Sequence, residues 1–550
     1  MEERYIASVD LGTSKLAVCI ARISGQDVQV IYYKESPSQG VRYSYVINPW
    51  KVENVLRDAL TQAQQELKIK IQQVIVGLPR YYVRQETASA SMSRTEPDSQ
   101  ISEEEIRTLK SMALEEYPLG DPKNDVIYGA VAQSFSTEDS IGELEADIVG
   151  MTAEKLEGNF KVFVGKRKHS ANIDSVFNSM GIAIAKKYFT PGITARAVLK
   201  EEQMENGVAL IDIGAGVSSV TIFKGKIMRF YAAIPFGGNS VTEDIKTECN
   251  FSFRLAENIK KAYGACMPGK LSALGEKTLQ IVDENETPTA HVGVKYISEI
   301  ISARMKEIIE ALLYYIQQSG YSSEDVLRAG VVVTGGGSDL VNCANYIKEL
   351  SGYSVKIGLP RRFFSNEGCP EAGEASAATS MGMIMAAKND ITLNCVNEAP
   401  ARRYWTAPKP AAAPIPDTDV ILSEAKNLPV PGTDVILSEA KNHPVPGTDV
   451  ILSEAKNHPV PEPVEGVERV EGPEPAIEES VISAQVDEST NVFDQPTEEE
   501  IKAAKIRKRK KPTGPREPRP KPQFTWLKHI QSTITKVTGD IFDDMENEEV

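Results

Sequence analysis

Two stretches of this chain share one pattern: a buried strand ending at an aspartate, a glycine-rich turn, and a second buried strand. The first, YIASVDLGTSKLAVCI, runs from Tyr5 to Ile20 and contains Asp10. The second, GVALIDIGAGVSSVTIF, runs from Gly207 to Phe223 and contains Asp212. The distance between them is far too long for a solenoid repeat. The pattern therefore predicts a duplicated α/β domain with two similar halves.

Turns of this kind suit a phosphate group. Gly214 and Gly216 have no side chain to keep a ligand from the backbone, and successive N–H groups in such a turn can point towards one site. Asp10 and Asp212 suit a hydrated Mg²⁺, which takes one or two carboxylates besides water and phosphate oxygens. One such turn alone is equally well an ordinary β-hairpin. Two of them favour phosphates clamped between the halves.

A third glycine element follows in the second half. Residues 329–340, AGVVVTGGGSDL, predict a buried strand, a triple glycine and a helix. The three glycines would let a base or a phosphate lie against the backbone. Between these elements, Glu257 and Lys260 share one face of a predicted helix, which suits either a surface ion pair or contact with a ribose or base.

Composition narrows the classes of function. The net charge of −16 argues against nucleic-acid binding by the whole chain. The six cysteines have no paired spacing, which indicates reduced thiols, and the five histidines are scattered, which argues against a metal site built from them. The sequence has no run of about 18 apolar residues, so we expect no membrane-spanning helix. The acidic start, MEERYIASVDL, leads into a strand, so we expect no signal peptide.

The pattern of predicted elements divides the chain into domains. Residues 1–85 and 168–206 are expected to form the first lobe, around a small α+β insertion at 86–167, and residues 207–390 the second lobe. In the first lobe, Asn48 and Pro49 are expected to begin a helix.

The rest of the chain changes character. Residues 391–500 predict a disordered, acidic, proline-rich linker with three copies of a 15-residue repeat, TDVILSEAKN(L/H)PVP, either a passive tether or a set of binding motifs. Residues 501–521 are basic, and 522–542 predict an amphipathic helix. A basic stretch before such a helix is typical of an interfacial membrane anchor, with a nucleic-acid-binding tail or a partner-docking helix as alternatives. The expected membrane-facing residues are Phe524, Trp526, Leu527, Ile530, Ile534 and Val537.

The order of these motifs is similar to that of a known superfamily. DLGTSK, PGITARAVL, DIGAG, AENIKKAYG and VVVTGGGS follow one another as in the actin, heat-shock-chaperone and sugar-kinase ATPases. Within that superfamily, IPFGGNSVTEDI, AENIKKAYG and the position of the insertion resemble the FtsA family of actin-like bacterial division proteins. The resemblance implies a duplicated, two-lobed actin-like (ribonuclease H-like) fold, in which the insertion is the 1C subdomain.

The resemblance also implies a site for ATP and Mg²⁺. Asp10 and Asp212 would hold the metal through water. The residues implied to bind the cofactor are Asp10, Gly12, Thr13, Ser14, Lys15, Asp212, Gly214, Ala215, Gly216, Val217, Ser218, Glu257, Lys260, Gly335, Gly336 and Ser338.

Two departures from the family pattern bear on catalysis. The second loop continues with Val217, Ser218 and Ser219 where the family has a threonine and an aspartate. Thr190-Pro191 stands where faster relatives place a glutamate or glutamine near the attacking water. Because phosphoryl transfer depends on positioning that water, we expect ATP binding with slow or no hydrolysis and no catalytic residue, so at most a weak ATPase.

The implied role is in cell division. The chain would anchor the tubulin-like ring protein FtsZ to the cytoplasmic face of the inner membrane at the division site. Its partners would be the C-terminal peptide of FtsZ, docked on residues 240–325, further copies of itself in a filament, anionic lipids and later division proteins, but no nucleic acid. A pilus-assembly-type actin-like ATPase and a metabolite kinase of the superfamily remain the alternatives.

Overall fold

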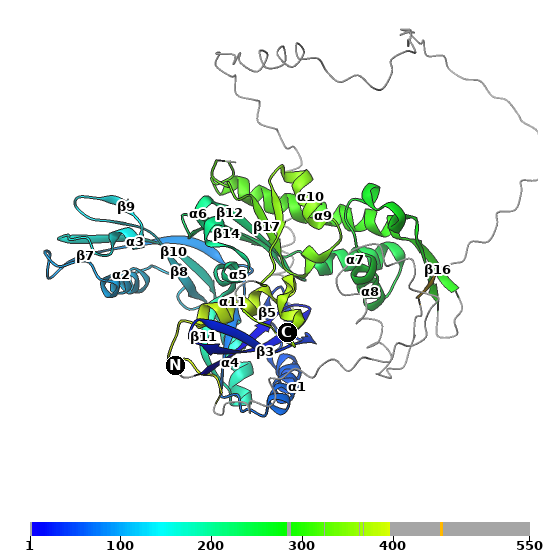
Figure 1. Ribbon diagram of the computed structural model, residues 1–550, viewed down its shortest axis with the longest axis horizontal. Helices are drawn as coiled ribbons and strands as arrows, with labels where there is room; N and C mark the ends of the chain where they lie inside the picture. Colours follow the sequence, from blue (N-terminus) through cyan, green and yellow to red (C-terminus); the bar gives the residue numbers. More distant parts are fainter. Residues whose placement is uncertain are drawn as a thin grey trace, which may run out of the picture. The chain divides into compact units, whose positions relative to one another are not determined.

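The computed structural model describes residues 3–282, 288–323, 325–361, 364–366, 368–396 and 452–454. The first lobe is built on a five-stranded sheet in the order β3-β2-β1-β6-β11. Figure 1 labels β3 and β11 of this sheet. β1, β2 and β3 pair antiparallel, whereas β1 and β6 run parallel, as do β6 and β11. The strands are Arg4–Leu11 (β1), Lys15–Ser24 (β2), Asp27–Pro37 (β3), Gln73–Leu78 (β6) and Ala183–Phe189 (β11).

The second lobe repeats this sheet strand for strand. Its order is β14-β13-β12-β17-β18, with β12, β13 and β14 antiparallel and with β12, β17 and β18 parallel. The strands are Val208–Ile213 (β12), Ser218–Lys224 (β13), Ile227–Ile234 (β14), Val331–Thr334 (β17) and Val355–Ile357 (β18). Two sheets of identical order and direction confirm the duplicated α/β domain that the two aspartate–glycine units predict, and the two-lobed actin-like fold that the resemblance implies.

Helix α1 (Pro49–Leu67) shows how local sequence sets an element of the first lobe. The Asn48 side chain accepts a hydrogen bond from Lys51 N at 3.1 Å, and proline occupies the first helical turn, as the sequence predicts. The helix ends at Lys68, whose φ of 53° is left-handed. Its buried residues recur at helical spacing: Val52, Leu56, Ala59, Leu60, Ala63 and Leu67.

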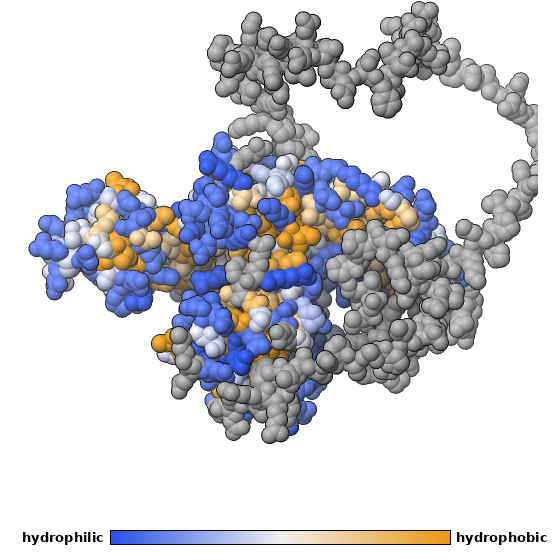
Figure 2. All heavy atoms as spheres, viewed as in Figure 1, coloured by the Kyte–Doolittle hydropathy of each residue, from blue (hydrophilic) through white to orange (hydrophobic). Residues whose placement is uncertain are grey.

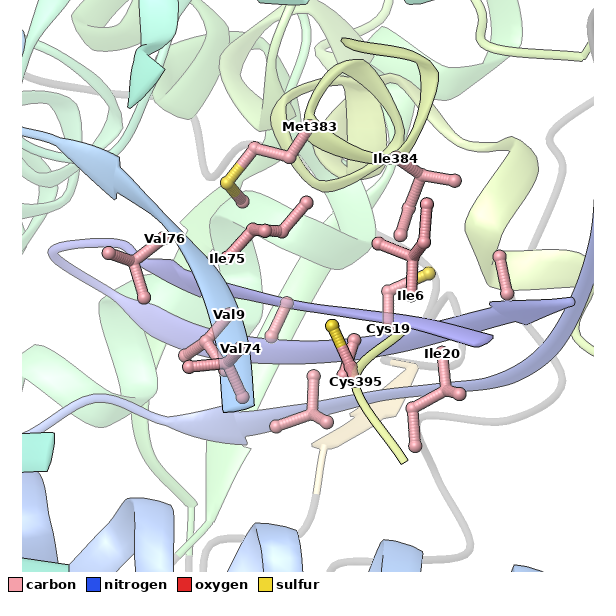
Figure 3. Close-up of a cluster of buried hydrophobic side chains, with 14 of the residues drawn as sticks. Ile6, Val9, Cys19, Ile20, Val74, Ile75, Val76, Met383, Ile384 and Cys395 are labelled. Atoms are coloured by element: carbon pink, nitrogen blue, oxygen red, sulfur yellow. The ribbon is translucent and has the colours of Figure 1, made fainter. Parts of the chain in front are cut away.

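Helix α11 (Ala378–Ala387) covers the first sheet with apolar side chains. Figure 3 shows its Met383 and Ile384 pointing toward Ile75 and Ile6 of the sheet, and all four belong to one buried cluster. The other helices of this lobe are α4 (Arg167–Met180) and α5 (Thr190–Val198). This packing ties a helix from the end of the fold to the first strand of the chain.

The second lobe carries its helices around a separate buried cluster. The long helix α9 contributes the largest share of that cluster, with Ile297, Ile301 and Met305 fully buried. The helices are α6 (Glu201–Asn206), α7 (Gly238–Cys249), α8 (Phe253–Tyr263), α9 (Val294–Gln318) and α10 (Cys343–Ser351). A β-hairpin of β15 (Thr278–Val282) and β16 (Pro288–Gly293) lies between α8 and α9 in the sequence.

The inserted segment forms its own sheet, in the order β7-β10-β8-β9. Helix α2 (Glu103–Glu115) starts at a capping box in which Ser102 and Glu105 bond each other's backbone N–H, as the Ser-Glu-Glu-Glu sequence predicts. The strands and the short second helix are Arg84–Ser93 (β7), Asp125–Ser136 (β8), Ile141–Glu143 (β9), Lys155–Lys166 (β10) and Glu145–Ile148 (α3).

The surface of the described part is mixed in polarity. Figure 2 shows hydrophilic residues over much of the visible face, with hydrophobic ones in separate groups. The most exposed large apolar side chains are Ile141 in β9 and Ile391, at 90% and 81%. Among the described helices, none has the length and apolar content to cross a bilayer.

The chain between residues 391 and 500 is described at two places. Residues 391–396 still belong to the first lobe, because Cys395 is buried and its N–H donates to Tyr5 O at 2.7 Å. Strand β19 (Leu452–Glu454), in the third repeat, pairs antiparallel with β15. A separate pair of short strands, β4 (Val41–Arg42) and β5 (Tyr45–Val46), belongs to the N-terminal part of the chain. Most of the predicted linker, the basic segment 501–521 and the helix 522–542 lie outside the described residues.

A buried arginine organises the inserted subdomain. The side chain of Arg94 is 1% exposed, and it donates to Glu105 Oε1 at 2.7 Å and to the carbonyl oxygens of Ser99 and Ala153 at 2.9 and 3.0 Å. The hydrogen bond from Arg94 lowers the pKa of Glu105 to about 2. Removing this guanidinium would leave several buried acceptors without a donor.

We therefore expect Arg94→Met to destabilise the insertion by about 3–5 kcal/mol, the usual effect of breaking a buried ion pair. Hydrogen exchange at the amides of β7 and β10 in the full chain measures this local free energy. Arg107→Met is the matched control, because Arg107 and Glu104 are 67% and 75% exposed and such pairs contribute about 1 kcal/mol or less. Equal exchange in both variants would contradict the expectation.

Candidate functional site

The two aspartates occupy equivalent places in the two sheets. Asp10 stands near the end of β1 and Asp212 near the end of β12, each opposite the first residues of an antiparallel partner strand. In each lobe a parallel strand, β6 or β17, runs alongside. The loops that follow these strands therefore gather at one edge of each sheet, as the ends of parallel strands must.

The two glycine loops face one another across the lobes. A Cβ added to Gly216 would lie 2.9 Å from Oγ1 and Cγ2 of Thr13, so the second loop approaches the first within contact distance. Thr13 Oγ1 also accepts a hydrogen bond from Ser44 N at 3.1 Å. This close approach favours glycine at position 216, and the structure brings the two predicted loops into contact.

The second loop is held from behind by the start of α7. Gly238 N donates to Gly214 O at 2.9 Å, and Asn239 N donates to Ala215 O at 2.8 Å. A Cβ on Gly237 would lie 2.2 Å from Gly214 O. This contact between the start of α7 and the second loop is one that the sequence does not predict.

The third glycine element lies against Asp212. Gly335 has φ +85°, and a Cβ there would lie 2.4 Å from Asp212 Oδ1. Ser338 is buried and donates to Gly335 O at 2.7 Å, while Gly336 has ordinary room around it. The predicted helix after the glycines is instead a short 3₁₀ turn, Gly336–Asp339, because glycine is a poor helix former and the left-handed Gly335 turns the chain first.

Glu257 and Lys260 form a half-buried network behind the second loop. Lys260 Nζ lies 2.6 Å from Glu257 Oε2, 2.9 Å from Gly238 O and 2.8 Å from Thr242 Oγ1. Burial lowers the pKa of Lys260; it also opposes ionisation of Glu257, but the ammonium holds the pKa of that carboxyl below its ordinary value. The pair therefore supports the start of α7. It is an ion pair, as one interpretation of the sequence has it, and its contact with a ribose or base stays a prediction.

Lys15 stands at the start of β2 and pairs with Glu35 of β3. Its charge acts on Asp10 in its own lobe and on Asp339 in the second lobe, lowering the pKa of both carboxyls. Burial outweighs that effect and raises the pKa of each to about 6. Lys15 is thus close enough to both lobes to act on a ligand between them.

One buried hydroxyl in the second loop lacks a partner. The Oγ of Ser218 is buried and makes no hydrogen bond within the described residues. A buried polar atom without a partner is costly, so this hydroxyl favours a ligand beside it. A phosphate oxygen has the acceptor character that this hydroxyl requires.

Arg80 is the residue that sequence reasoning missed. It follows β6 and forms an ion pair with Asp212 in the other lobe, their side chains 17% and 10% exposed. Arg80 comes two residues after β6, which runs parallel to the strand that carries Asp10, but no local signal in the sequence places it opposite Asp212. Asp212 thus already has a cationic partner at the place where a Mg²⁺ would lie. As placed, Asp10 and Asp212 do not fit a Mg²⁺ shared between both carboxylates.

Comparison with known proteins gives one family. The model of the family described as "Cell division protein FtsA" matches residues 209–382. The FtsA proteins of Neisseria meningitidis serogroup B and Enterococcus hirae are both 26% identical, over 365 and 354 residues. These alignments cover 66% and 64% of this chain and 85% and 78% of the relatives.

The chain is a relative of the FtsA family of actin-like cell-division proteins. The FtsA of Streptococcus pneumoniae serotype 2 is also 26% identical, over 66% of this chain and 76% of its own. A solved PilM-PilN type IV pilus biogenesis complex aligns with a TM-score of 0.49 and 15% identity, over 70% of this chain and 98% of that chain. The actin-like fold of this FtsA relative is therefore established by the order and direction of its own two sheets.

The start of α5 in this FtsA relative carries no carboxylate. Thr190 is buried, and its Oγ1 donates to Leu78 O at 3.4 Å, while Pro191 is buried beside it. A Cβ on Gly77 would lie 2.5 Å from Thr190 Cγ2, so the helix start packs directly on the end of β6. At this position the described structure offers packing and no general base.

We expect Gly335→Ala to destabilise this FtsA relative. A residue with a Cβ at this φ is strained by about 1–3 kcal/mol, and its contact with Asp212 would add to that strain. Gly293→Ala is the control, since nothing lies within 4 Å of a Cβ there and its φ is not left-handed. Thermal unfolding of the full-length variants measures both. A melting temperature for Gly335→Ala equal to that of the control would contradict the close approach.

Proposed function

We propose that this FtsA relative binds ATP between its two lobes and links FtsZ to a membrane during cell division. The observation that carries the nucleotide part is the approach of Gly216 to Thr13, which brings two phosphate-type loops into one cleft. The orphaned hydroxyl of Ser218 and the position of Lys15 between two lobes support a polyphosphate there. The relation to FtsA supports the division role.

The residues proposed to hold the nucleotide fall into three groups. Gly12, Thr13, Ser14 and Lys15 would contact phosphates from the first lobe, and residues 214–218 would do so from the second. Gly335, Gly336 and Ser338 would lie against the nucleoside. Glu257 and Lys260 would support the site indirectly. Their hydrogen bonds hold the start of α7, which in turn holds the loop at Gly214.

We propose that hydrolysis is slow. Thr190 and Pro191 at the start of α5 offer no carboxylate or amide to orient an attacking water. The second loop lacks the aspartate of the family pattern at Ser219, which is buried in β13. Bound ATP would then serve to stabilise one arrangement of the lobes and favour a filament of this protein.

The full chain should therefore turn over ATP far more slowly than the about 1–100 s⁻¹ of kinases, for lack of a water-positioning group. Release of inorganic phosphate at saturating ATP measures the rate. Pro191→Glu tests the cause, because it places a carboxylate at the start of α5. If the missing group limits the rate, this variant should release phosphate at least as fast as the unmodified chain. A kinase-like rate in the unmodified chain would contradict the proposal.

We propose that the amphipathic helix at 522–542 binds anionic lipid, aided by the basic segment before it. The apolar face led by Phe524 and Trp526 would enter the interface, and the bases would contact the headgroups. FtsZ would dock its C-terminal peptide on residues 240–325, and the insertion would contact the next copy in a filament. The location that follows is the cytoplasmic face of the inner membrane at the division site, where later division proteins join.

We expect the full chain to sediment with vesicles of phosphatidylglycerol and phosphatidylethanolamine, and a chain ending at Pro520 to stay in solution. A labelled FtsZ C-terminal peptide should sediment only with the full chain, yet bind both chains equally in solution by fluorescence anisotropy. Equal sedimentation of the two chains would exclude the anchor. Failure of the full chain to bind the peptide would exclude the FtsZ link.

A further inference from the structure

Arg80 places a positive charge at the centre of the cleft between the lobes. It lies just beyond β6 in the first lobe, and its guanidinium pairs with Asp212 at the end of β12 in the second. A Cβ on Gly214 would lie 2.3 Å from Arg80 Nη2, so the guanidinium also touches the second glycine loop. One side chain of the first lobe thus contacts both the carboxylate and the phosphate-type turn of the other lobe.

The backbone of Arg80 is held from both lobes. Its N–H donates to Ser44 Oγ at 3.3 Å, and Ser44 N donates in turn to Thr13 of the first glycine loop. Its carbonyl oxygen accepts a hydrogen bond from the hydroxyl of Tyr231 in β14. These bonds hold the main chain of Arg80, and the ion pair with Asp212 holds its guanidinium beside the second glycine loop.

The charges around Arg80 keep it ionised. Burial opposes its charge, but Asp212, Tyr231 and Asp10 raise the pKa of the guanidinium above its ordinary value. The other charged groups of the cleft are Lys15, which is paired with Glu35, and Asp339. Arg80 is therefore the cation that neutralises the two facing carboxylates.

A guanidinium and a divalent cation compete for such a position. Two like charges a few ångströms apart repel strongly in a partly desolvated site. A guanidinium also carries five N–H donors in a plane, which match the oxygens of a phosphate group in a bidentate manner. The position that two carboxylates would give to a hydrated Mg²⁺ is thus filled by a group that can itself bind phosphate.

We propose that Arg80 supplies the positive charge that the nucleotide phosphates require, so that this protein binds ATP and ADP with an affinity that depends little on Mg²⁺. The proposal rests on the nucleotide site of the proposed function and adds Arg80 to it. Arg80 donates to phosphate oxygens, and the backbone N–H groups of the two glycine loops complete the site.

The test compares nucleotide affinities of the full chain in excess EDTA and in excess MgCl₂, by titration calorimetry with ATP and with ADP. For the unmodified chain we expect the two affinities to agree within about threefold, and for Arg80→Gln we expect binding in EDTA to be about 10- to 100-fold weaker. Added MgCl₂ should restore part of that loss, because the cation can enter once the guanidinium is gone. A role of Arg80 in holding the lobes alone would weaken binding equally in both buffers.

Arg57→Gln is the matched control, since it removes the same charge from the surface of α1, where Arg57 is 52% exposed. Arg80→Lys keeps the charge, loses the bidentate geometry and should fall between the unmodified chain and Arg80→Gln. Binding by the unmodified chain that falls more than about tenfold in EDTA would overturn the proposal, even if Arg80→Gln fails to fold. Absence of binding in both buffers would instead overturn the nucleotide site itself.

Discussion

The approach of the two glycine loops is the constraint on which the rest of the structure depends. Gly216 and Thr13 lie in contact, and the ion pair of Arg80 with Asp212 joins the same edges of the two sheets. Two helices of the first lobe, α5 and α11, also approach each other closely at a glycine. A Cβ on Gly382 of α11 would lie 2.5 Å from Ile193 O of α5, so these helices pack backbone to backbone. Close helix packing and close loop approach both depend on glycine, at positions far apart in the sequence.

The elements that could be predicted are those whose signals are local. Asn48-Pro49 begins α1, Ser102 and three glutamates begin α2, and the aspartate–glycine pattern gives two pairs of strands. Strand β7 could not be predicted from local signals. Its residues, RQETASASMS, are polar and small, and only their pairing with β10 from Lys155 to Val164 makes them a strand. Such pairing lies outside any local window.

The site residues also fall into those with a local sequence signal and those without one. The loops and aspartates were predictable, because glycine turns and strand ends are visible in the sequence. The partners of Glu257 and Lys260 were not, since Thr242 and Gly238 become neighbours only when α7 packs on α8. Arg80 was predictable in position, after a strand parallel to β1, but not in its contact with Asp212. That contact depends on how the two lobes face each other.

Arg80 also connects the cleft to the insertion. Its carbonyl oxygen accepts from the Tyr231 hydroxyl, and Tyr231 N donates to Gln85 Oε1 of β7 at 3.0 Å. On the same strand β14, the side chain of Arg229 donates to Gln133 O at 3.0 Å in β8. Arg80 is therefore bonded to the strand that carries the hydrogen bonds to the inserted sheet.

This arrangement favours a cleft that grips its ligand over one that turns it over. The charged side chains nearest the loops are already engaged, Arg80 with Asp212 and Lys15 with Glu35, and the start of α5 contributes packing. A general base must be free to accept a proton from water. Burial raises the pKa of Asp10 to about 6, while the charges of Arg80 and Lys15 oppose that rise. The contacts of the site therefore favour tight binding of a polyphosphate in one arrangement of the lobes over its hydrolysis.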